Sequence, residues 1–399
     1  MRKSTILTMI LVILSVTGCF GKNDTVTTNL NTTASTSATI VRETNIATAV
    51  DADKIGISNT APTDIIEYTT TDVINETDNV SVDIIEDDMN DETMEEADDM
   101  FTAGQNDIII NSGSKWFLKG ILTLPEGQGP FPTVVIVPAS GRLTRYTYID
   151  MMDYLVKRGI AAISFDKRSI AHIETLTDTY YTIREDCLDD ALAAVALAGT
   201  IKKLDRDRIF VLGHSLGGYI IPQMNEEDFE NIIAGYISMA SGAMNMIESL
   251  PMDAELVEVF NPEMTEEEAA SRRKEILEAY EDIKNLTSED YGRADRIYGY
   301  YPAWWLEMSG YDPMESAGRI EEPILFMQGT HDLGEIIDTE NLNKWRLATK
   351  NNPKAIYKLY PGLNHFFTET ESIGERKSYF SMDEEVLSDI ADFLNKNPS

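Results

Sequence analysis

The sequence predicts an α/β fold in which a mostly parallel sheet is covered by helices on both faces. Short apolar runs, such as residues 133–137 and 160–165, have the length of buried strands. Segments with a helical spacing of apolar residues separate these runs, so that strand and helix alternate from about residue 105 to the end. Strands that are buried on both faces and joined by helices are typical of a parallel sheet.

The expected elements follow one another in a regular order. An opening pair of strands is expected at residues 108–110 and 116–124, before the first buried strand at 133–137. Apolar runs predict the later strands at residues 160–165, 209–212, 232–239, 324–327 and 355–359. Helical periodicity predicts helices at residues 147–157, 182–198, 266–284, 338–349 and 382–395.

A serine flanked by glycines follows the strand expected at residues 209–212. The five residues there are Gly213, His214, Ser215, Leu216 and Gly217. A G-x-S-x-G pattern between a strand and a helix is typical of a nucleophile elbow. Glycine is needed because a Cβ atom would clash with neighbouring backbone in so tight a turn. We therefore expect Ser215 to be a catalytic nucleophile at the end of the sheet.

A serine hydroxyl is a poor nucleophile at neutral pH and needs a base, which is most often a histidine. Of the four histidines, only His365 lies far enough after Ser215 for an acid on its own strand to come between them. Asp332 is the candidate acid, although Glu335 and Asp338 lie close by. The histidine and the acid both lie on loops after expected strands, where such sheets place their ligands.

The N-terminus has the features of a signal sequence. Arg2 and Lys3 precede an apolar stretch at residues 6–16, which is too short to span a membrane. Small residues then lead into Cys19, a pattern that resembles the lipobox of bacterial lipoproteins. We expect residues 1–18 to be removed and Cys19 to be lipidated, which anchors the protein to the bacterial cell membrane outside the cytoplasm. An ordinary secretory signal with an incidental cysteine is the alternative.

Residues 19–104 differ in composition from the rest of the chain. They are rich first in Thr, Ser, Asn and Ala and then in Asp and Glu, with few aromatic residues. Such a segment has too little apolar surface to offset the entropy of ordering, so we expect a disordered tether before a domain at residues 105–399. The formal charge of −35 argues against nucleic acid as a partner. The lipid anchor is then the only expected contact with the membrane.

The alternation of strands and helices stops between residues 243 and 321. A charged segment with helical periodicity at residues 266–284 is followed by an aromatic cluster. The cluster includes Tyr300, Tyr301, Trp304 and Trp305. An insertion at this position is expected to form a cap over the elbow and to exclude water from it. The aromatic side chains either line a substrate pocket or pack the cap onto the domain.

From about Asp107 to the end, the chain resembles the α/β-hydrolase superfamily, and most of all the bacterial esterases related to dienelactone hydrolases and to prolyl-oligopeptidase catalytic domains. The motifs that carry this resemblance are residues 137–141, 165–168, 213–222 and 363–367. Residues 137–141 stand where those esterases have their oxyanion loop. Pro138 and Ala139 replace the usual His-Gly there, and Ser169 replaces a glycine. The resemblance implies an oxyanion hole made by the backbone N–H of Leu216 and that of Ala139 or Ser140.

The resemblance also implies an activity. Ser215 would attack an ester carbonyl, His365 would carry the proton, and Asp332 would orient the imidazole. We expect a small-molecule ester with a small or medium acyl group as the substrate, and neither a metal nor an organic cofactor. A serine peptidase of the prolyl-oligopeptidase type is an alternative, although no propeller-sized domain precedes the hydrolase-like part. A non-catalytic, surface-binding lipoprotein is a second alternative, against which the complete set of serine, acid and histidine argues.

Overall fold

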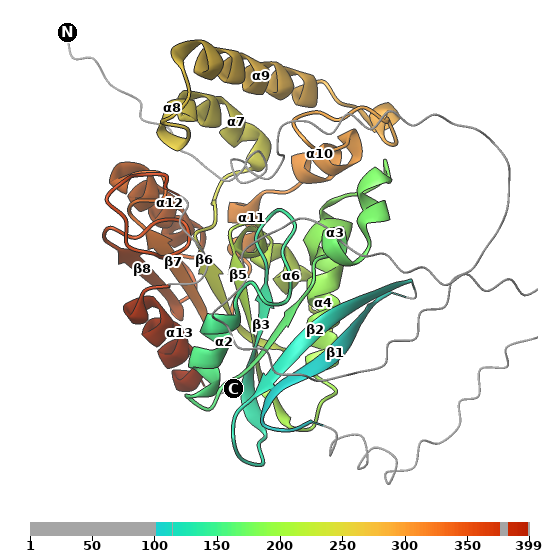
Figure 1. The fold of residues 1–399 in the computed structure, drawn as a ribbon, viewed down its shortest axis with the longest axis vertical. Helices are drawn as coiled ribbons and strands as arrows, with labels where there is room; N and C mark the ends of the chain where they lie inside the picture. Colours follow the sequence, from blue (N-terminus) through green and yellow to red (C-terminus); the bar gives the residue numbers. More distant parts are fainter. Residues whose placement is uncertain (1–100, 114, 376–381, 398–399) are drawn as a thin grey trace, which may run out of the picture. The chain divides into compact units, whose positions relative to one another are not determined.

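The computed structural model describes residues 101–113, 115–375 and 382–397. They form an eight-stranded sheet in the order β1-β2-β4-β3-β5-β6-β7-β8 (Figure 1). The strands are β1 (Gly104–Ser112), β2 (Trp116–Leu124), β3 (Phe131–Val137), β4 (Ala161–Phe165), β5 (Leu204–His214), β6 (Ile233–Met239), β7 (Ile324–Gly329) and β8 (Ala355–Tyr360). Each of the expected strands is present.

The direction of the strands confirms a mostly parallel sheet. Only β2 runs antiparallel to both of its neighbours, β1 and β4, and the pairs from β4 to β8 are all parallel. Every residue of β4 and of β7 is buried, because helices cover both faces of the sheet there. In the edge strand β1, buried and more exposed residues alternate. The short apolar runs in the sequence therefore come from strands covered on both sides.

Helices form a layer on each face of the sheet. α2 (Ile149–Val156) and α13 (Glu384–Lys396) share one apolar cluster on one face and lie next to each other in Figure 1. On the other face the main helices are α4 (Asp189–Ala198), α6 (Ile221–Glu227) and α12 (Glu335–Ala348). Shorter helical turns are α3 (Arg168–Ala171), η2 (Ile173–Thr177), η3 (Arg184–Leu188) and α5 (Leu216–Tyr219).

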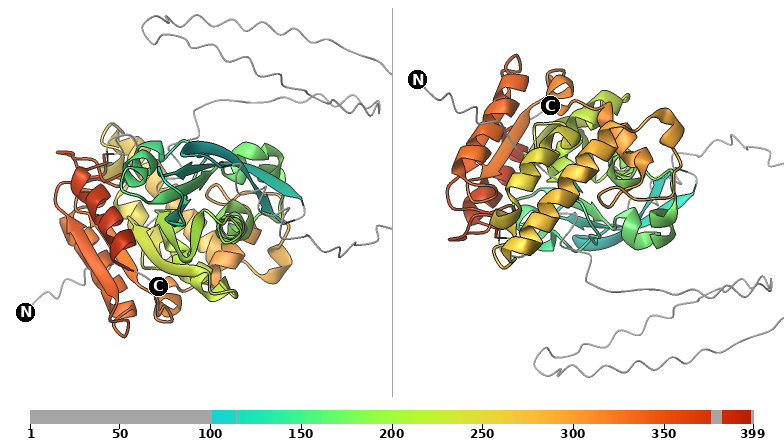
Figure 2. Two further views of the ribbon diagram at one scale, coloured as in Figure 1. Left: turned by 90° about the horizontal axis from the view of Figure 1, so that it is seen from below. Right: turned by 90° about the horizontal axis from the view of Figure 1, so that it is seen from above.

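The predicted cap, residues 243–321, corresponds to a group of helices between β6 and β7. They are α7 (Met246–Glu255), α8 (Val257–Phe260), α9 (Glu266–Lys284), η4 (Ser288–Asp290), α10 (Pro302–Ser309) and α11 (Pro313–Ala317). A capping box starts α9, because Thr265 and Glu268 each bind the other's backbone N–H. Figures 1 and 2 show α7 and α9 beyond the end of the sheet. We keep the name cap for this group.

Some boundaries differ from the prediction. The predicted tether ended at residue 104, but β1 already begins there, and Phe101 packs against the core. Lys203 also donates a hydrogen bond to the carbonyl of Phe101. The folded part thus begins at least four residues earlier than expected. The helix expected at residues 182–198 is divided into the π-helical turn η3 and α4.

The predicted signal sequence at residues 1–18 and Cys19 lie outside the described residues, as does the tether up to residue 100. In the part of the chain that the structure does describe, no helix combines the length and the apolar composition that a membrane span requires. The other cysteine, Cys187, is buried, and burial raises the pKa of its thiol to about 12.

Candidate active site

Ser215 lies in the turn between β5 and α5, in a backbone conformation that L-residues rarely adopt. Its φ is 56° and its ψ is −114°. Strain of this kind costs of the order of 1–3 kcal/mol and is common at functional sites. The Ser215 N–H donates to the Met239 carbonyl at 2.8 Å, and the Ser215 carbonyl accepts from the Tyr219 N–H at 2.9 Å. The neighbouring strand β6 and the helix after the turn therefore hold the strained serine in place.

The glycines of the elbow are required by close backbone contacts, as the sequence predicts. A Cβ atom on Gly213 would lie 2.3 Å from the carbonyl carbon of Gly217. A Cβ atom on Gly217 would lie 2.3 Å from the carbonyl oxygen of Val137. The elbow thus packs directly against the end of β3, where the expected oxyanion loop starts. The Ser215 side chain is buried, and its hydroxyl makes no hydrogen bond to any described residue.

The loops after β7 and β8 bring the predicted acid and base together. Asp332 Oδ2 lies 2.8 Å from Nδ1 of His365, and both side chains are buried. The His331 N–H donates to the Leu363 carbonyl at 2.9 Å, which joins the two loops. They can approach so closely because residue 329 is glycine: a Cβ atom there would lie 2.2 Å from the same carbonyl oxygen.

The contact with Asp332 determines which nitrogen of His365 is available for chemistry. A carboxylate accepts hydrogen bonds, so Nδ1 carries the proton and donates it. The other nitrogen, Nε2, is then the one that can accept a proton from a nucleophile. Asn364 shapes the turn, since its side-chain oxygen accepts from the backbone N–H groups of Phe366 and Thr368 at 2.9 and 3.1 Å.

Asp332 is the acid that binds His365. The carboxyl groups of Glu335 and Asp338, the other two nearby acids, lie in different surroundings. Glu335 is exposed at the start of α12. Asp338 is buried and shares the side-chain amide of Gln328 with Asp332, at 3.1 Å from each. Burial, together with the nearby charge of Asp332, raises the pKa of Asp338 to about 9. Sequence reasoning did not identify Gln328, which connects the two acids.

His214 and Tyr148 form a second contact with the His365 loop. His214 Nε2 lies 2.9 Å from the backbone carbonyl of His365, which can only accept a hydrogen bond. The Nδ1 atom of His214 is therefore the acceptor for the Tyr148 hydroxyl, 3.0 Å away. The hydroxyl oxygen in turn accepts from the Ala139 N–H at 3.3 Å. This chain connects the expected oxyanion loop to His365 through the residue next to Ser215.

These contacts distinguish between the backbone N–H groups of the three residues predicted for the oxyanion hole. The Ala139 N–H is already donated to Tyr148, and Pro138 has no N–H to offer. Ser140 is the next residue of the loop, and its N–H is the other donor that the family resemblance implies. Leu216 opens α5, so its N–H has no partner within the helix. We therefore favour Leu216 and Ser140, and not Ala139, as the donors.

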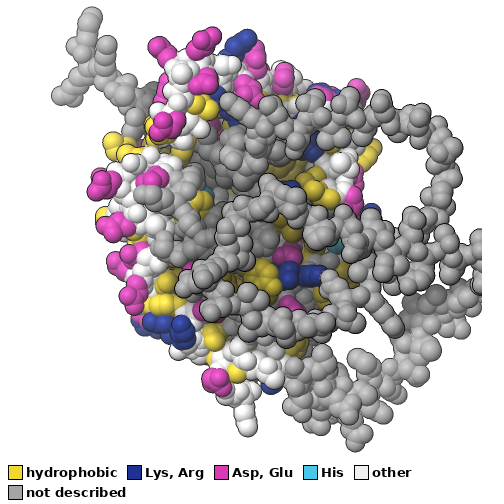
Figure 3. Space-filling model, viewed as in Figure 1, with side chains coloured by type: hydrophobic (Ala, Val, Ile, Leu, Met, Phe, Trp, Pro, Cys, Tyr) yellow, Lys and Arg dark blue, Asp and Glu magenta, His cyan; other side chains and the backbone are white. Residues whose placement is uncertain are grey.

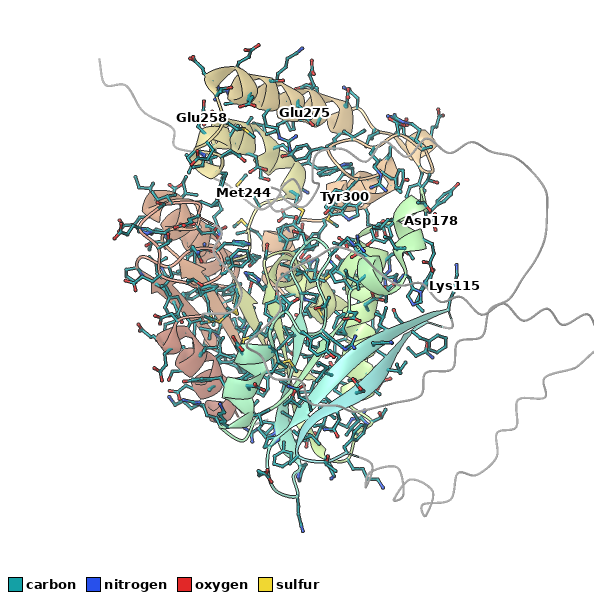
Figure 4. The ribbon with its side chains drawn as sticks, in the orientation of Figure 1. Lys115, Asp178, Met244, Glu258, Glu275 and Tyr300 are labelled. Carbon is teal, nitrogen blue, oxygen red and sulfur yellow. The ribbon has the colours of Figure 1, made fainter. Side chains whose placement is uncertain are left out.

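A pocket of about 300 Å³ lies between the expected oxyanion loop, the α3–η2 segment and the cap. Its lining includes Gly141, Ser169, Leu176, Tyr181, Tyr300 and Tyr301. Figure 4 shows Tyr300 on the side of the cap nearest α3. Trp304 and Trp305 are instead buried within the cap, where Tyr300 stacks on Trp304 with 4.0 Å between ring centroids. The aromatic cluster thus combines both predicted roles, since its tyrosines line a pocket and its tryptophans pack.

The sheet order and the loops after β5, β7 and β8 now decide the fold. The chain has the α/β-hydrolase fold. Two family models match parts of this α/β-hydrolase chain, that for FrsA-like esterases at residues 77–238 and that for the dienelactone hydrolase family at residues 284–397. The chain is 25% identical to the esterase EstD of Thermotoga maritima over 302 residues, which is 73% of this chain and 68% of EstD.

Solved structures of other proteins are also similar to this chain. Est1E from Butyrivibrio proteoclasticus, determined with bound ferulic acid, is 16% identical with a TM-score of 0.48, and the match covers 73% of this chain and 98% of Est1E. A proline iminopeptidase from Mycobacterium smegmatis is 15% identical with a TM-score of 0.48, over 73% of this chain and 98% of the peptidase.

Proposed function

We propose that the protein is a serine carboxylesterase with Ser215, His365 and Asp332 as its catalytic triad. One observation carries this proposal: the strained serine turn and the hydrogen-bonded pair of His365 and Asp332 meet at one end of the sheet. His214, the residue before Ser215, binds the backbone of His365 at 2.9 Å. The serine turn and the histidine loop are therefore in contact. The similarity to EstD supports the choice of an ester as the substrate.

In the first half of the reaction, Ser215 Oγ attacks the carbonyl carbon of the ester and gives its proton to Nε2 of His365. Asp332 stabilises the imidazolium that forms, through the hydrogen bond at Nδ1. The N–H groups of Leu216 and Ser140 bind the oxyanion of the tetrahedral intermediate. The intermediate collapses when the C–O bond to the alcohol breaks, and the leaving oxygen takes the proton from His365. The acyl group then remains bonded to Ser215.

In the second half, water attacks the acyl-enzyme. His365 takes one proton from the water and then returns it to Ser215 Oγ as the acyl bond breaks. The products are a carboxylic acid and the free serine. The chemistry consumes one water per ester and needs no oxidant or reductant.

The substrate proposed for this site is an ester of a small or medium acyl group. The pocket beside the oxyanion loop has a volume of about 300 Å³, at the lower end of the range for small-molecule sites. Its tyrosine and leucine side chains favour an apolar or aromatic group. We further propose that the enzyme acts outside the cytoplasm, anchored to the membrane through a lipid on Cys19. The mass of the mature N-terminus tests that anchor.

The replacement Ser215→Ala tests the proposed reaction in the full-length protein. Removal of the nucleophile is expected to lower kcat for a nitrophenyl butyrate ester by several orders of magnitude, with the melting temperature preserved. Ser309→Ala is the matched control, because Ser309 is an exposed serine at the end of α10 and should leave kcat unchanged.

A folded Ser215→Ala protein that retained wild-type turnover would rule out the proposed mechanism. The same assay on a proline-containing peptide anilide compares the two substrate classes. Faster cleavage of the anilide than of the ester by the wild-type protein would favour a peptidase. Slow or absent cleavage of the anilide is the result that we expect.

A further inference from the structure

We propose that Lys167 is a positioning residue of the oxyanion hole. By binding the Ala139 carbonyl, it holds the peptide between Ala139 and Ser140 so that the Ser140 N–H is aimed at the oxyanion. This inference rests on the proposed function. It assigns a role to a side chain outside the serine motif, in the segment at residues 165–168.

Lys167 is a buried cation with two partners. The side chain is 1% exposed and directly follows β4 and Asp166. Its Nζ atom lies 3.2 Å from the Ala139 carbonyl oxygen and 3.1 Å from Oδ1 of Asp186. Burial, the largest single effect, lowers the pKa of Lys167, but the attraction and hydrogen bond of Asp186, together with the nearby Cys187 and Asp190, outweigh it, and the pKa is raised overall. The lysine therefore stays charged while it holds the carbonyl.

Because the peptide bond is planar, the contact at the Ala139 carbonyl also orients the Ser140 N–H. The Ala139 carbonyl and the Ser140 N–H belong to one planar trans peptide, so they point in opposite directions. Fixing the carbonyl toward Lys167 therefore fixes the direction of the N–H. The preceding peptide is fixed as well, because the Ala139 N–H donates to the Tyr148 hydroxyl at 3.3 Å. Both peptide groups of Ala139 are thus held, one by each of two buried side chains.

The loop that Lys167 holds lies against the serine turn. A Cβ atom on Gly217 would be 2.3 Å from the Val137 carbonyl oxygen and 3.0 Å from that of Pro138. Ser140 follows this contact by only two residues, so a small rotation of its peptide changes the position of the N–H at the site. A cation at the carbonyl also polarises the peptide, which makes the N–H at the other end a stronger donor. Lys167 therefore both orients the Ser140 N–H and makes it a stronger hydrogen-bond donor.

Asp186 connects this support to the pocket beside the loop. Tyr181 donates its hydroxyl proton to the same Oδ1 atom that binds Lys167, at 2.9 Å. Both Asp186 and Tyr181 line the pocket of about 300 Å³. The carboxylate thus balances the charge of the lysine at the wall of the proposed acyl pocket. Asp186 anchors Lys167, and Lys167 binds the oxyanion loop.

The test compares variants that remove the cation with variants that keep it. Lys167→Met alone would leave Asp186 as a buried, unpaired charge, so the main variant is the double replacement Lys167→Met with Asp186→Asn. We expect its kcat for nitrophenyl butyrate to fall by about 10²-fold with KM little changed, as for the loss of one oxyanion donor. Lys167→Arg should restore most of the activity.

A transition-state analogue separates positioning from a general structural effect. A butyryl trifluoromethyl ketone forms an oxyanion with Ser215, whereas butyrate does not. The double variant should bind the ketone about 10²-fold more weakly and butyrate with unchanged affinity. A folded double variant with wild-type kcat and ketone affinity would overturn the proposal, and so would an equal loss of affinity for both ligands.

The variants at Lys167 and at Ser215 distinguish a failure of the role proposed for Lys167 from a failure of the esterase mechanism. If the double variant does not fold, Lys167→Gln takes its place, since glutamine retains a donor without the charge. A kcat about 10-fold lower is then expected, and an unchanged kcat contradicts the role of the cation. Loss of activity in Ser215→Ala without any effect at Lys167 overturns only the present inference. Retained activity in Ser215→Ala overturns the esterase mechanism itself.

Discussion

His365 is held at two points, by its ring and by its backbone. Asp332 binds the ring at Nδ1, and His214 binds the carbonyl, with 2.8 and 2.9 Å between the atoms. His214 is itself oriented by the Tyr148 hydroxyl. A base that is oriented in this way can be close to its working geometry before the substrate arrives. In the proposed mechanism, Tyr148, at the N-terminal boundary of α2, thus influences a proton transfer in which it takes no direct part.

Tyr148→Phe tests the importance of this series of hydrogen bonds. The replacement leaves the Ala139 N–H and His214 Nδ1 buried without their partner, which typically costs about 1–3 kcal/mol per unsatisfied group. We expect a lower melting temperature and a kcat reduced by about 10-fold, with KM largely preserved. Thermal denaturation and steady-state kinetics measure the two effects. Tyr146→Phe, at an exposed tyrosine, is the matched control, and equal behaviour of the two variants would contradict this account.

The candidate catalytic residues could be identified from the sequence, and the side chains that contact them could not. Ser215 and His365 were found from an elbow pattern and from chain order, and Asp332 from its place after a strand. Lys167, Tyr148 and Gln328 act through contacts with residues elsewhere in the chain or through buried partners. Lys167 lies in one of the motifs that carry the family resemblance, but the motif does not tell which groups the lysine contacts, and Tyr148 and Gln328 lie in none of the motifs. The choice between Ala139 and Ser140 likewise depended on which N–H the fold already uses.

At the scale of elements, the strands were predicted better than the helices. Burial on both faces makes a strand a short apolar run, which the sequence displays directly. The helix expected at residues 182–198 instead contains a π-helical turn at Arg184–Leu188. That turn includes Asp186, the partner of Lys167, and apolar periodicity cannot anticipate an ion pair with a residue elsewhere in the chain. Likewise, α12 begins at Glu335, before the predicted start at 338, because loop backbone N–H groups bind Asp338 in its first turn.

The cap contains a buried carboxyl group without a partner. Asp253, in α7, is fully buried, and neither of its oxygens forms a hydrogen bond with a described residue. Burial raises the pKa of Asp253 to about 8. The unfolded chain loses this proton near pH 4, whereas the native state keeps it up to about pH 8. The native state is therefore favoured by the bound proton at low pH, and this stabilisation is lost as the pH rises through that window.

Asp253→Asn is expected to remove this pH dependence. The amide is neutral at every pH, so the variant should melt at a higher temperature than wild type at pH 8 and at nearly the same temperature at pH 4. Melting curves measured between pH 4 and 9 give the comparison. Asp282→Asn, at an exposed acid of α9, controls for the change in net charge. If the difference between Asp253→Asn and wild type were the same at pH 4 and pH 8, the assignment of a neutral buried carboxyl would be wrong.

At the scale of the whole molecule, composition indicates the charge of the surface and the approximate start of the domain. The chain has a formal charge of −35, and Figure 3 shows Asp and Glu side chains along α12 and over α9. Such a surface repels anionic surfaces and nucleic acid, in keeping with the partners expected from composition. Composition indicated where the domain begins only approximately. Phe101 and Thr102 contact the folded part, although the residues just before them are acidic.

Trimming the N-terminus tests the boundary of the domain. A chain that begins at Phe101 should keep the melting temperature and the ester turnover of the longer protein, because the catalytic chemistry and the core both lie beyond that point. A chain that begins at Gln105 loses Phe101 and the hydrogen bond that Lys203 donates to it, so we expect it to melt several degrees lower. Lower stability or turnover of the chain that begins at Phe101 would show that the preceding segment contributes to the fold.

The position of β8 has a consequence for the order in which the protein is made. β8 and α13 leave the ribosome last among the described elements, yet the loop after β8 supplies His365. A nascent chain that has already folded β1 to β7 holds the serine and the acid but has no base to activate them. Its exposed β7 is then an open, mostly apolar edge that can pair with another chain. Synthesis thus delays the proposed activity until β8 and its loop have been made, and the same delay creates a brief period in which aggregation competes with folding.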